Sequence, residues 1–393
     1  MIINDKRALA YIAVVHDIRP IAGADNIELV HILGWQCIAK KNEFQEGDKA
    51  VYFEIDSKVP ASDARFAFMS SKHYNVKTYK LNKFGVIGQG LAMPASVFPE
   101  VAELEVGTDV TELLGVTYSI VEDNIRKSSD RAMEILKSRK PKLFKNRFIK
   151  WLMKRRWGRW LVMKLWGSKT EKATAFPSKF EYIKKTDQER VENMPWVLND
   201  KTPFIKTQKC DGSSGTFILE RVRKNKFKFY VCSRNVRQLK PSQKCWYDEN
   251  IYWEMAIKYD IENVLKKLMK THTRWKYCCF QGEICGPKIQ GNPHHLPEND
   301  LFIFHFIDSE HGKWDIRVVK KMCDDYGLKT VPISDDNYIL PDDLESLKQD
   351  AVYYYDSSCC NGDANCLAEG YVYYSSVDPN FSFKNVSRQY LLK

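Results

Sequence analysis

Hydrophobic residues in the first 120 positions fall in short runs separated by turn-forming residues. The turns include GADN at 23–26 and EGD at 46–48. Strands of this length, closely spaced and with little helix between them, predict a small β-barrel. The runs cover residues 8–15, 28–33, 36–40, 50–55 and 77–81, and a further run begins at residue 92.

A helical period replaces the strand pattern between residues 142 and 166. Apolar and aromatic side chains recur there at near-helical intervals, with Lys and Arg between them, which predicts an amphipathic helix. Gly158 is its one helix-breaking residue. Three interpretations stay open for this segment: a basic connector packed on a domain, a nucleic-acid contact, or a helix that binds membranes or calmodulin. The apolar positions are Phe144, Phe148, Trp151, Leu152, Trp160, Met163 and Trp166.

The second half of the chain combines alternating segments with helices. Phe227, Phe229 and Val231 alternate with polar residues, and the stretches 302–306 and 371–373 place aromatic residues at every second position. Such alternation predicts strands with one buried face. Residues 250–270 give the clearest helical pattern of this half.

The composition adds limits to this picture. The chain has 393 residues, of which 44% are hydrophobic and 28% charged. This length predicts two or three domains that each bury a core, and the composition excludes disordered, collagenous and disulfide-scaffold proteins. No apolar run approaches the roughly 20 residues of a membrane span. The 11 cysteines are scattered, so we expect reduced thiols in an intracellular protein, cytoplasmic or nuclear.

The positive charge is concentrated in one segment. Residues 126–172 contain 17 Lys and Arg but only three acids, a local charge of +14, whereas the whole chain carries +11. The rest of the protein is therefore close to neutral. Four of the ten tryptophans lie in the same segment. Basic residues interleaved with aromatic ones suit contacts to phosphates and bases.

The first candidate for chemistry is a lysine at the end of a predicted strand. Residues 204–208 form an apolar-to-polar strand that runs into Lys209, and a tight polar turn with Gly212 and Gly215 follows. This arrangement can present an amine and backbone N–H groups to one phosphate. Alone it is equally compatible with a surface lysine before a turn.

Five further clusters follow in a fixed order, and together they carry the functional inference. A strand ends at Arg234, a second ends near Glu283, and a third is the aromatic strand around Phe304. Glu369 begins a fourth strand and Lys384 lies in a fifth. This series resembles the motifs of the covalent nucleotidyltransferases, the superfamily of RNA ligases, DNA ligases and mRNA capping enzymes.

One branch of that superfamily is more similar still. The chain resembles the RNA ligases with an N-terminal OB-fold domain, the group that includes the Deinococcus and Naegleria enzymes. The similarity rests on ADNIE at 24–28, Gly34–Trp35, Phe176–Pro177, KKTDQER at 184–190 and the end from Phe383 to Leu392.

The resemblance implies an α+β fold in three parts. Residues 1–120 would form an OB-fold β-barrel that binds nucleic acid, and residues 121–175 a basic, aromatic helical connector. Residues 176–393 would form the nucleotidyltransferase domain, with ATP-grasp-like antiparallel sheets and flanking helices. DNA ligases and capping enzymes place an OB domain after the last motif, but only nine residues follow Lys384 here. The domain order therefore favours an RNA ligase.

The resemblance also assigns roles to the six clusters. Lys209 would be the nucleophile that attacks the α-phosphorus of ATP, and it must do so as a neutral amine. We therefore expect the site to lower its pKa by burial and neighbouring positive charge. Lys384 and Arg234 would be further catalytic residues: Lys384 would stabilise charge on the α-phosphate, and Arg234 would contact the nucleotide or the 5′-phosphate. Phe304 would stack on the adenine.

Three carboxylates complete the expected site. Asp211, Glu283 and Glu369 repel each other unless a cation lies between them, which predicts Mg²⁺ or Mn²⁺ held mostly through water. The residues expected to bind ATP are Gln208, Lys209, Arg234, Glu283, Phe304, Glu369 and Lys384. Relatives carry a second lysine where this chain has Val386. Either Arg388 takes its place or Lys384 acts alone.

The expected function is ATP-dependent sealing of RNA 3′-OH and 5′-phosphate ends through lysyl-adenylate and RNA-adenylate intermediates. The resemblance implies nicked duplexes with RNA on the 3′-OH side, either RNA or an RNA/DNA hybrid, and a role in RNA repair. We expect a monomer without membrane contacts, with Lys154, Arg155 and Arg156 on the nucleic acid. The alternatives are a nucleic-acid-binding protein with an inactive transferase domain and a capping-type transferase.

Overall fold

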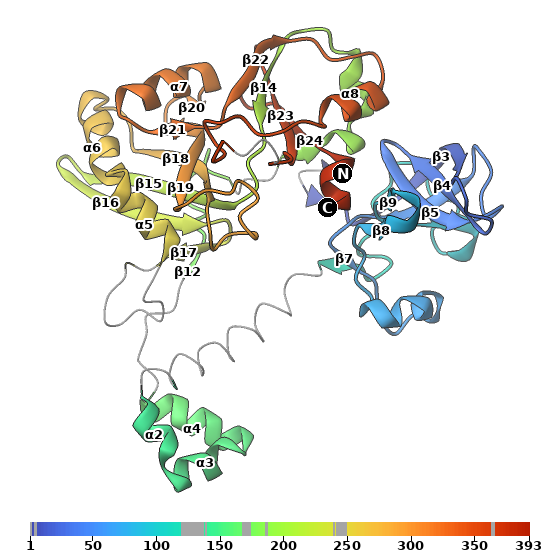
Figure 1. The fold of residues 1–393 in the computed structure, drawn as a ribbon, viewed down its shortest axis with the longest axis horizontal. Helices are drawn as coiled ribbons and strands as arrows, with labels where there is room; N and C mark the ends of the chain where they lie inside the picture. The colour runs from blue at the N-terminus through green and yellow to red at the C-terminus, as the bar shows by residue number, and fades with distance from the viewer. Residues whose placement is uncertain are drawn as a thin grey trace.

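The computed structural model describes residues 2–3, 6–118, 137, 140–166, 174–184, 188–238, 240, 250–362 and 366–393. Much of the predicted basic segment, at 119–136, 138–139 and 167–173, lies outside the described residues, as does 185–187. Figure 1 shows a β-rich N-terminal domain, a helical unit of α2–α4 and a larger C-terminal domain.

The N-terminal domain is built on a curled antiparallel sheet in the order β10-β6-β3-β4-β5. The long strand β3 pairs with β6 through its first half and with β4 through its second. Trp35 and Tyr52 stack inside the curl, and Phe53, Phe66 and Phe98 pack on the other side of the sheet. The predicted strands are thus confirmed. The main strands are β3 (Ala10–Pro20), β4 (Ile27–Ile32), β5 (Trp35–Lys40), β6 (Lys49–Phe53) and β10 (Leu91–Pro94).

Short elements cover the ends of this sheet. The 3-10 helices are η1 (Ala64–Lys72), η2 (Asn82–Phe84) and η3 (Ala95–Val97). The short strands are β1 (Ile2–Ile3), β2 (Lys6–Arg7), β7 (Ser57–Lys58), β8 (Tyr79–Leu81), β9 (Val86–Gly88) and β11 (Thr117–Tyr118).

The predicted amphipathic helix is three helices. They are α2 (Pro141–Lys145), α3 (Arg147–Met153) and α4 (Arg156–Trp166). The prediction of Gly158 as the breaker was wrong, because Gly158 lies inside α4. A Cβ built there would lie 2.0 Å from the Leu152 carbonyl oxygen, so glycine lets α4 pack closely on α3. The chain instead breaks at Asn146, which caps α3, and between α3 and α4.

The C-terminal domain contains two sheets. The larger has the order β12-β17-β16-β15-β18-β19-β20, with β21 beside β19, and the smaller has the order β13-β24-β23-β14-β22. A continuous core joins Ile205 and Tyr374 of the smaller sheet to Phe217 and Phe280 of the larger. The larger sheet comprises β12 (Thr174–Ala175), β15 (Ser213–Arg223), β16 (Lys226–Ser233), β17 (Val236–Gln238), β18 (Tyr277–Cys285), β19 (Asp300–Asp308), β20 (Gly312–Lys313) and β21 (Lys329–Thr330).

The smaller sheet and the helices complete this domain. The strands are β13 (Glu189–Arg190), β14 (Phe204–Gln208), β22 (Ile333–Tyr338), β23 (Gly370–Ser375) and β24 (Ser382–Val386). The helices are α5 (Ile251–Lys258), α6 (Ile261–Thr271), α7 (Ile316–Asp325), α8 (Leu344–Asp350), α9 (Arg388–Leu392) and the 3-10 turns η4 (Val191–Asn193) and η5 (Pro195–Asn199).

Two predictions for this domain need correction. The helix expected at 250–270 is split into α5 and α6, because Asp260 adopts a left-handed conformation with φ 47°. The strands β19 and β23 are buried on both faces rather than one. The alternating aromatic residues therefore predicted the strands correctly. They did not show that the opposite face of each strand is buried as well.

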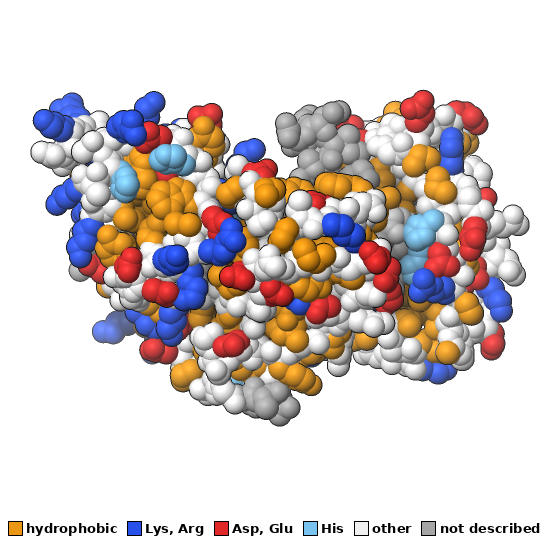
Figure 2. All heavy atoms as spheres, turned by 90° about the horizontal axis from the view of Figure 1, so that it is seen from above, with side chains coloured by type: hydrophobic (Ala, Val, Ile, Leu, Met, Phe, Trp, Pro, Cys, Tyr) orange, Lys and Arg blue, Asp and Glu red, His pale blue; other side chains and the backbone are white. Residues whose placement is uncertain are grey.

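Charge is distributed unevenly over these parts. The face shown in Figure 2 mixes acidic and basic side chains. By contrast, the sequence from Lys140 to Trp166 contains ten Lys and Arg and no acid. No helix among the described residues is long and apolar enough to cross a membrane.

A buried amide joins the N-terminal and C-terminal domains. Asn193 accepts hydrogen bonds from the Tyr11 hydroxyl and the Trp35 indole N–H. Its amide nitrogen donates to Glu54, at 2.9 Å, and to Glu189, at 2.6 Å. All four hydrogen-bonding positions of the side chain are thus used, three of them across the domain boundary. Beside it, the Gly34 N–H donates to the Glu192 carbonyl.

We expect Asn193→Ala to lower the free energy of unfolding by about 2 to 3 kcal/mol, because it leaves the Trp35 indole N–H and one Glu54 oxygen buried without this partner. Urea denaturation measures the change. Asn337→Ala, at an exposed asparagine, is the control and should change stability by less than about 0.5 kcal/mol. Equal losses in the two variants would contradict the role of this amide.

Candidate active site

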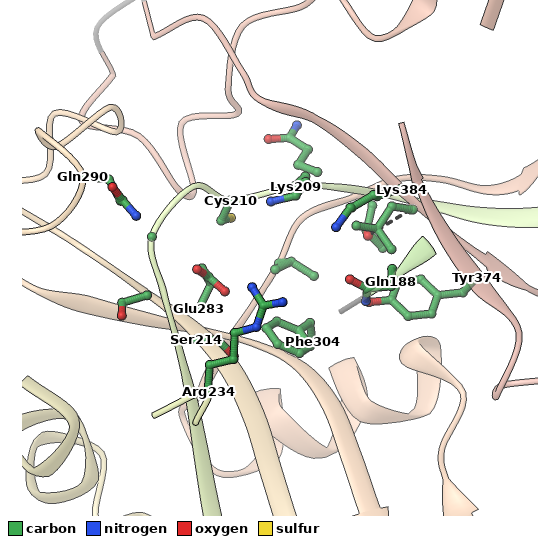
Figure 3. A pocket seen from close by; sticks show the side chains of 16 residues that line it. Gln188, Lys209, Cys210, Ser214, Arg234, Glu283, Gln290, Phe304, Tyr374 and Lys384 are labelled. Atoms are coloured by element: carbon green, nitrogen blue, oxygen red, sulfur yellow. Dashed lines mark hydrogen bonds between the residues drawn. The ribbon is translucent and has the colours of Figure 1, made fainter. Parts of the chain in front are cut away.

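A cavity of about 300 Å³, here called the lysine cavity, lies where the two C-terminal sheets meet. Figure 3 shows side chains from both sheets converging on it. Six of the predicted residues line it: Gln208, Lys209, Arg234, Glu283, Phe304 and Lys384. The structure therefore brings together residues up to 176 positions apart in the sequence.

Backbone contacts fix Lys209 at the end of β14. Its N–H donates to the Gly370 carbonyl at 2.8 Å, which ties it to the start of β23. The Tyr355 hydroxyl donates to the Lys209 carbonyl and accepts from the Glu369 N–H. One hydroxyl therefore bridges the backbones of the two residues. Their side chains meet, with 2.5 Å between Lys209 Nζ and Glu369 Oε2.

Carboxylates dominate the electrostatics of Lys209. Burial lowers the pKa of Lys209, but the charges of Glu369, Glu283 and Asp211 outweigh burial and raise it above its usual value. The lower pKa expected from burial and neighbouring positive charge is therefore not produced by the chain alone, and the expected divalent cation would have to contribute. The largest charge effect comes from Glu369, which contacts Lys209. The order of the motifs in the sequence does not show how close these two residues lie.

The pKa of Glu283 is raised as well, but here burial contributes to the rise. Burial is the largest cause, and together with the charges of Glu369 and Asp211 it raises the pKa of Glu283 to about 8, although Lys209 opposes the shift. Glu283, Glu369 and Asp211 thus lie close enough to repel one another. An excess of carboxylates around a cavity suits a divalent cation.

The third carboxylate, Asp211, lies just outside the lining of the cavity. Its side chain accepts a hydrogen bond from the Tyr390 hydroxyl of α9. Among the described residues, no three His, Cys, Asp or Glu side chains are close enough to form a direct metal site. The donor set fits an ion that keeps most of its water, as Mg²⁺ does, rather than a cage of protein ligands.

The remaining predicted residues occupy different walls of the cavity. In Figure 3, Lys384 points in from β24, opposite Glu283, and the Arg234 guanidinium lies near Phe304. The Gln208 side chain turns aside, because its carbonyl oxygen accepts from the Asp356 N–H at 3.0 Å. Gln208 thus braces the loop after Tyr355.

Val386 occupies the position of the second lysine that relatives carry. Val386 is buried, and Arg388 pairs with Glu345 through two contacts of 2.8 Å. Neither lines the lysine cavity, and Lys384 is the lysine of β24 that does.

Sequence reasoning missed several residues of the site. Gln188, Gln290 and Tyr374 line the cavity, and Tyr390 holds Asp211. Gln188 and Tyr390 lie in stretches that carried the family resemblance, which was the available signal. Gln290 and Tyr374 carry no sequence signal, because the fold alone brings them there.

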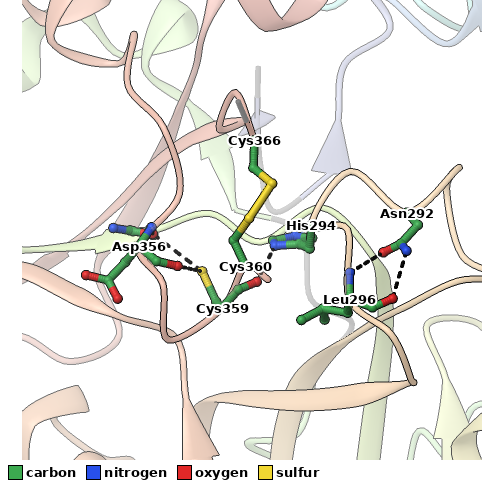
Figure 4. The surroundings of a disulfide bond; sticks show 8 residues. Asn292, His294, Leu296, Asp356, Cys359, Cys360 and Cys366 are labelled. Carbon is green, nitrogen blue, oxygen red and sulfur yellow. Dashed lines mark hydrogen bonds between the residues drawn. A yellow bond between two sulfur atoms is a disulfide. The ribbon is translucent and has the colours of Figure 1, made fainter. Parts of the chain in front are cut away.

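A second brace for Asp211 comes from His294, which is fully buried. His294 Nε2 accepts from the Asp211 N–H at 3.1 Å, and Nδ1 donates to the Cys359 carbonyl at 2.8 Å. Figure 4 shows this histidine beside the 356–366 loop, where Cys360 and Cys366 form a disulfide. The expectation of reduced thiols was wrong for this pair, because spacing alone does not show that a loop folds back on itself. Among the residues that the structure describes, eight other cysteines are free.

Comparison with known proteins identifies the family. An OB-fold domain model matches residues 9–95, and an RNA ligase model matches residues 202–386. A structure of Naegleria gruberi RNA ligase with pyrophosphate is 30% identical, with a TM-score of 0.70 and 98% of each chain covered. The chain belongs to the RNA ligases. No curated protein matches it significantly.

Two further structures of the same Naegleria ligase place this RNA ligase in context. A variant with ATP and Mn is 30% identical, and one with AMP and Mn is 29% identical, with TM-scores of 0.70 and 0.71. Both comparisons cover 98% of each chain. The expected α+β fold with an N-terminal OB-fold is thus confirmed for this RNA ligase.

The raised pKa of Glu283 predicts how the stability of this RNA ligase varies with pH. Folded Glu283 keeps its proton up to about pH 8, whereas the unfolded carboxyl loses it near 4.5. The free energy of unfolding without metal should therefore fall as the pH rises between these values. We expect Glu283→Gln to match the parent at pH 4.5 and to exceed it by about 1 kcal/mol or more at pH 8.

Thermal melts in EDTA at the two pH values measure this difference. Added Mn²⁺ should stabilise the parent more than the variant at pH 8. A gain that is the same at both pH values would contradict the assignment.

Proposed function

We propose that this RNA ligase uses ATP to join RNA 3′-OH and 5′-phosphate ends through a lysyl-adenylate and an RNA-adenylate. The observation that carries the proposal is the convergence of Lys209, Arg234, Phe304 and Lys384 on one cavity. The Naegleria ligase, at 30% identity, has been solved with ATP and Mn.

Lys209 is the nucleophile of the first step. Its Nζ attacks the α-phosphorus of ATP, an N–P bond forms, and the bond to the pyrophosphate oxygen breaks. The ammonium must first lose a proton, for which Glu369 Oε2 is the nearest acceptor at 2.5 Å. A divalent cation near Asp211, Glu283 and Glu369, bound largely through water, would supply the positive charge that lowers the pKa of Lys209.

The other residues orient ATP and stabilise charge. Lys384 and Arg234 approach from different strands and offset the negative charge that develops on the α-phosphate. Phe304 offers its ring face to the adenine. Gln208 fixes the backbone that carries the nucleophile. In the next steps AMP passes to the RNA 5′-phosphate, and the 3′-OH then attacks that phosphorus and releases AMP.

The first test is covalent labelling with α-labelled ATP and Mg²⁺ or Mn²⁺, read on a denaturing gel. We expect labelled protein from ATP but not from GTP. Lys209→Ala should remove the label because the nucleophile is gone, and Lys384→Ala should reduce it at least about 100-fold.

Lys201→Ala is the matched control, because Lys201 pairs with Asp342 outside the cavity and should label like the parent. Absence of label from the parent with either metal would favour a nucleic-acid-binding protein with an inactive transferase domain. Label on Lys209→Ala would reject the assigned nucleophile.

We further assign residues 1–120 to nucleic-acid binding, 121–175 to a basic connector and 176–393 to the nucleotidyltransferase domain. The substrate is a nicked RNA duplex or RNA/DNA hybrid, bound by a monomer inside the cell. The role is RNA repair.

The helical unit α2–α4 has the properties of a nucleic-acid contact. It has only a small core, made of Ile149, Leu152 and Val162, and leaves most of its aromatic rings outside. Trp160 is 61% exposed, and the Arg155 guanidinium lies 4.4 Å from the Trp151 ring. A connector packed on a domain would bury these rings, so their exposure supports stacking and phosphate contacts.

Replacing Lys154, Arg155 and Arg156 with alanine should weaken binding of nicked RNA and flatten its salt dependence. Each phosphate contact contributes about 0.9 to the slope of log K against log salt concentration, so the slope should fall by about 2 to 3. Filter binding over a salt series measures it. The control removes Lys266, Lys267 and Lys270 on α6, the same charge elsewhere. Equal slopes in both triple variants would favour the connector.

A further inference from the structure

A second and larger cavity, here called the junction cavity, lies where the N-terminal and C-terminal domains meet. Its volume is about 1020 Å³. Leu33 contributes from the N-terminal domain, and Asn193, the amide that joins the domains, forms part of the wall. Gln188 lines both this cavity and the lysine cavity, so the two adjoin.

The same strands serve both cavities. β18, β19 and β24 each place one residue in the lysine cavity and a residue one or two positions away in the junction cavity. Two positions along a strand span about 7 Å, a step comparable to one nucleotide of an extended strand. The pairs are Glu283 and Gln281, Phe304 and His305, and Lys384 and Ser382.

The walls of the junction cavity combine an exposed ring with cations. Trp196 is 58% exposed, although its ring lies 6.0 Å from that of Phe381. Lys184 and Lys313 line the same space, together with the carboxylates Glu181 and Glu189. Among the described residues, no carboxylate lies within ion-pair distance of Lys313. Burial, and then the neighbouring charge of Lys184, lowers the pKa of Lys313 to about 8, while Asp378 opposes the shift. An anion in the cavity would find an uncompensated amine.

A buried histidine supplies the most specific feature. His305 is 5% exposed, and its Nε2 has no hydrogen-bond partner among the described residues. Gln281 fixes the tautomer. The Gln281 amide nitrogen donates to the Lys184 carbonyl and to Thr216, so its oxygen is the acceptor that faces His305 Nδ1 at 3.0 Å. Nδ1 therefore carries the proton, and Nε2 is a buried acceptor without a partner on a histidine that lines the cavity.

A bare acceptor, an open ring face and a cation are together complementary to one ribonucleotide. We propose that the junction cavity binds the ribonucleotide next to the reactive RNA end, with its 2′-hydroxyl donating to His305 Nε2. Its base stacks on Trp196 and its phosphate pairs with Lys313. The 2′-hydroxyl is the donor that distinguishes RNA from DNA, so this site makes sealing selective for RNA. The inference rests on the proposed ligase function.

The test is single-turnover sealing of nicked duplexes in which each nucleotide near the nick is replaced in turn by its 2′-deoxy or abasic form. The parent should lose about 10-fold in sealing rate for both replacements at one position. His305→Phe should lose sensitivity to the 2′-deoxy replacement there, and Trp196→Ala should lose sensitivity to the abasic one.

Two controls separate this inference from the proposed function. All variants should form the lysyl-adenylate at the parental rate, because the junction cavity does not hold ATP. Phe68→Ala, at a ring that is 59% exposed outside the cavity, should keep both sensitivities.

A parent that is not labelled by ATP would reject the ligase function itself. A labelled, sealing parent whose sensitivities are unchanged by Trp196→Ala would overturn the junction site, even if His305→Phe fails to fold.

Discussion

The ion pair between Lys209 and Glu369 is the contact on which the rest of the site depends. It joins the end of β14 to the start of β23, and the Tyr355 hydroxyl holds the two backbones together from behind. An amine held against a carboxylate is kept protonated, so the folded chain alone would hold the proposed nucleophile in an unreactive form. In the proposed mechanism, a cation that arrives with ATP supplies the positive charge that lowers the pKa of Lys209.

Much of the surrounding structure preserves this geometry. Tyr390 and His294 hold Asp211 from α9 and from the 286–296 loop, and Gln208 holds the loop after Tyr355. Tyr390 and His294 lie far from Lys209 in the sequence, whereas Gln208 directly precedes it. They position charged groups that would otherwise separate, since Glu283, Glu369 and Asp211 repel one another.

The sequence predicted the strands of both domains and six residues of the lysine cavity, because period-two patterns and ordered motifs are local signals. It could not predict features that depend on distant contacts. Asn193 reads as an ordinary polar residue of a 3-10 turn, and only the fold shows Tyr11, Trp35 and Glu54 around it. The break between α3 and α4 was missed for a related reason. Gly158 suggests a helix break in the sequence, but it lies inside α4, where it leaves room for the backbone of Leu152.

The domain junction connects binding to chemistry through one short stretch of chain. Gln188 lines both cavities, Glu189 hydrogen-bonds Asn193, and Arg190 lies in β13 beside Lys384 of β24. The N-terminal domain is therefore held in place by the segment that also borders the lysine cavity. A nucleic acid bound across that domain would therefore contact two domains whose relative position is fixed by these hydrogen bonds. Because Asn193 uses all its hydrogen-bonding groups in this contact, separating the domains would expose several buried polar groups at once. The interface thus holds the two domains in one arrangement beside the lysine cavity.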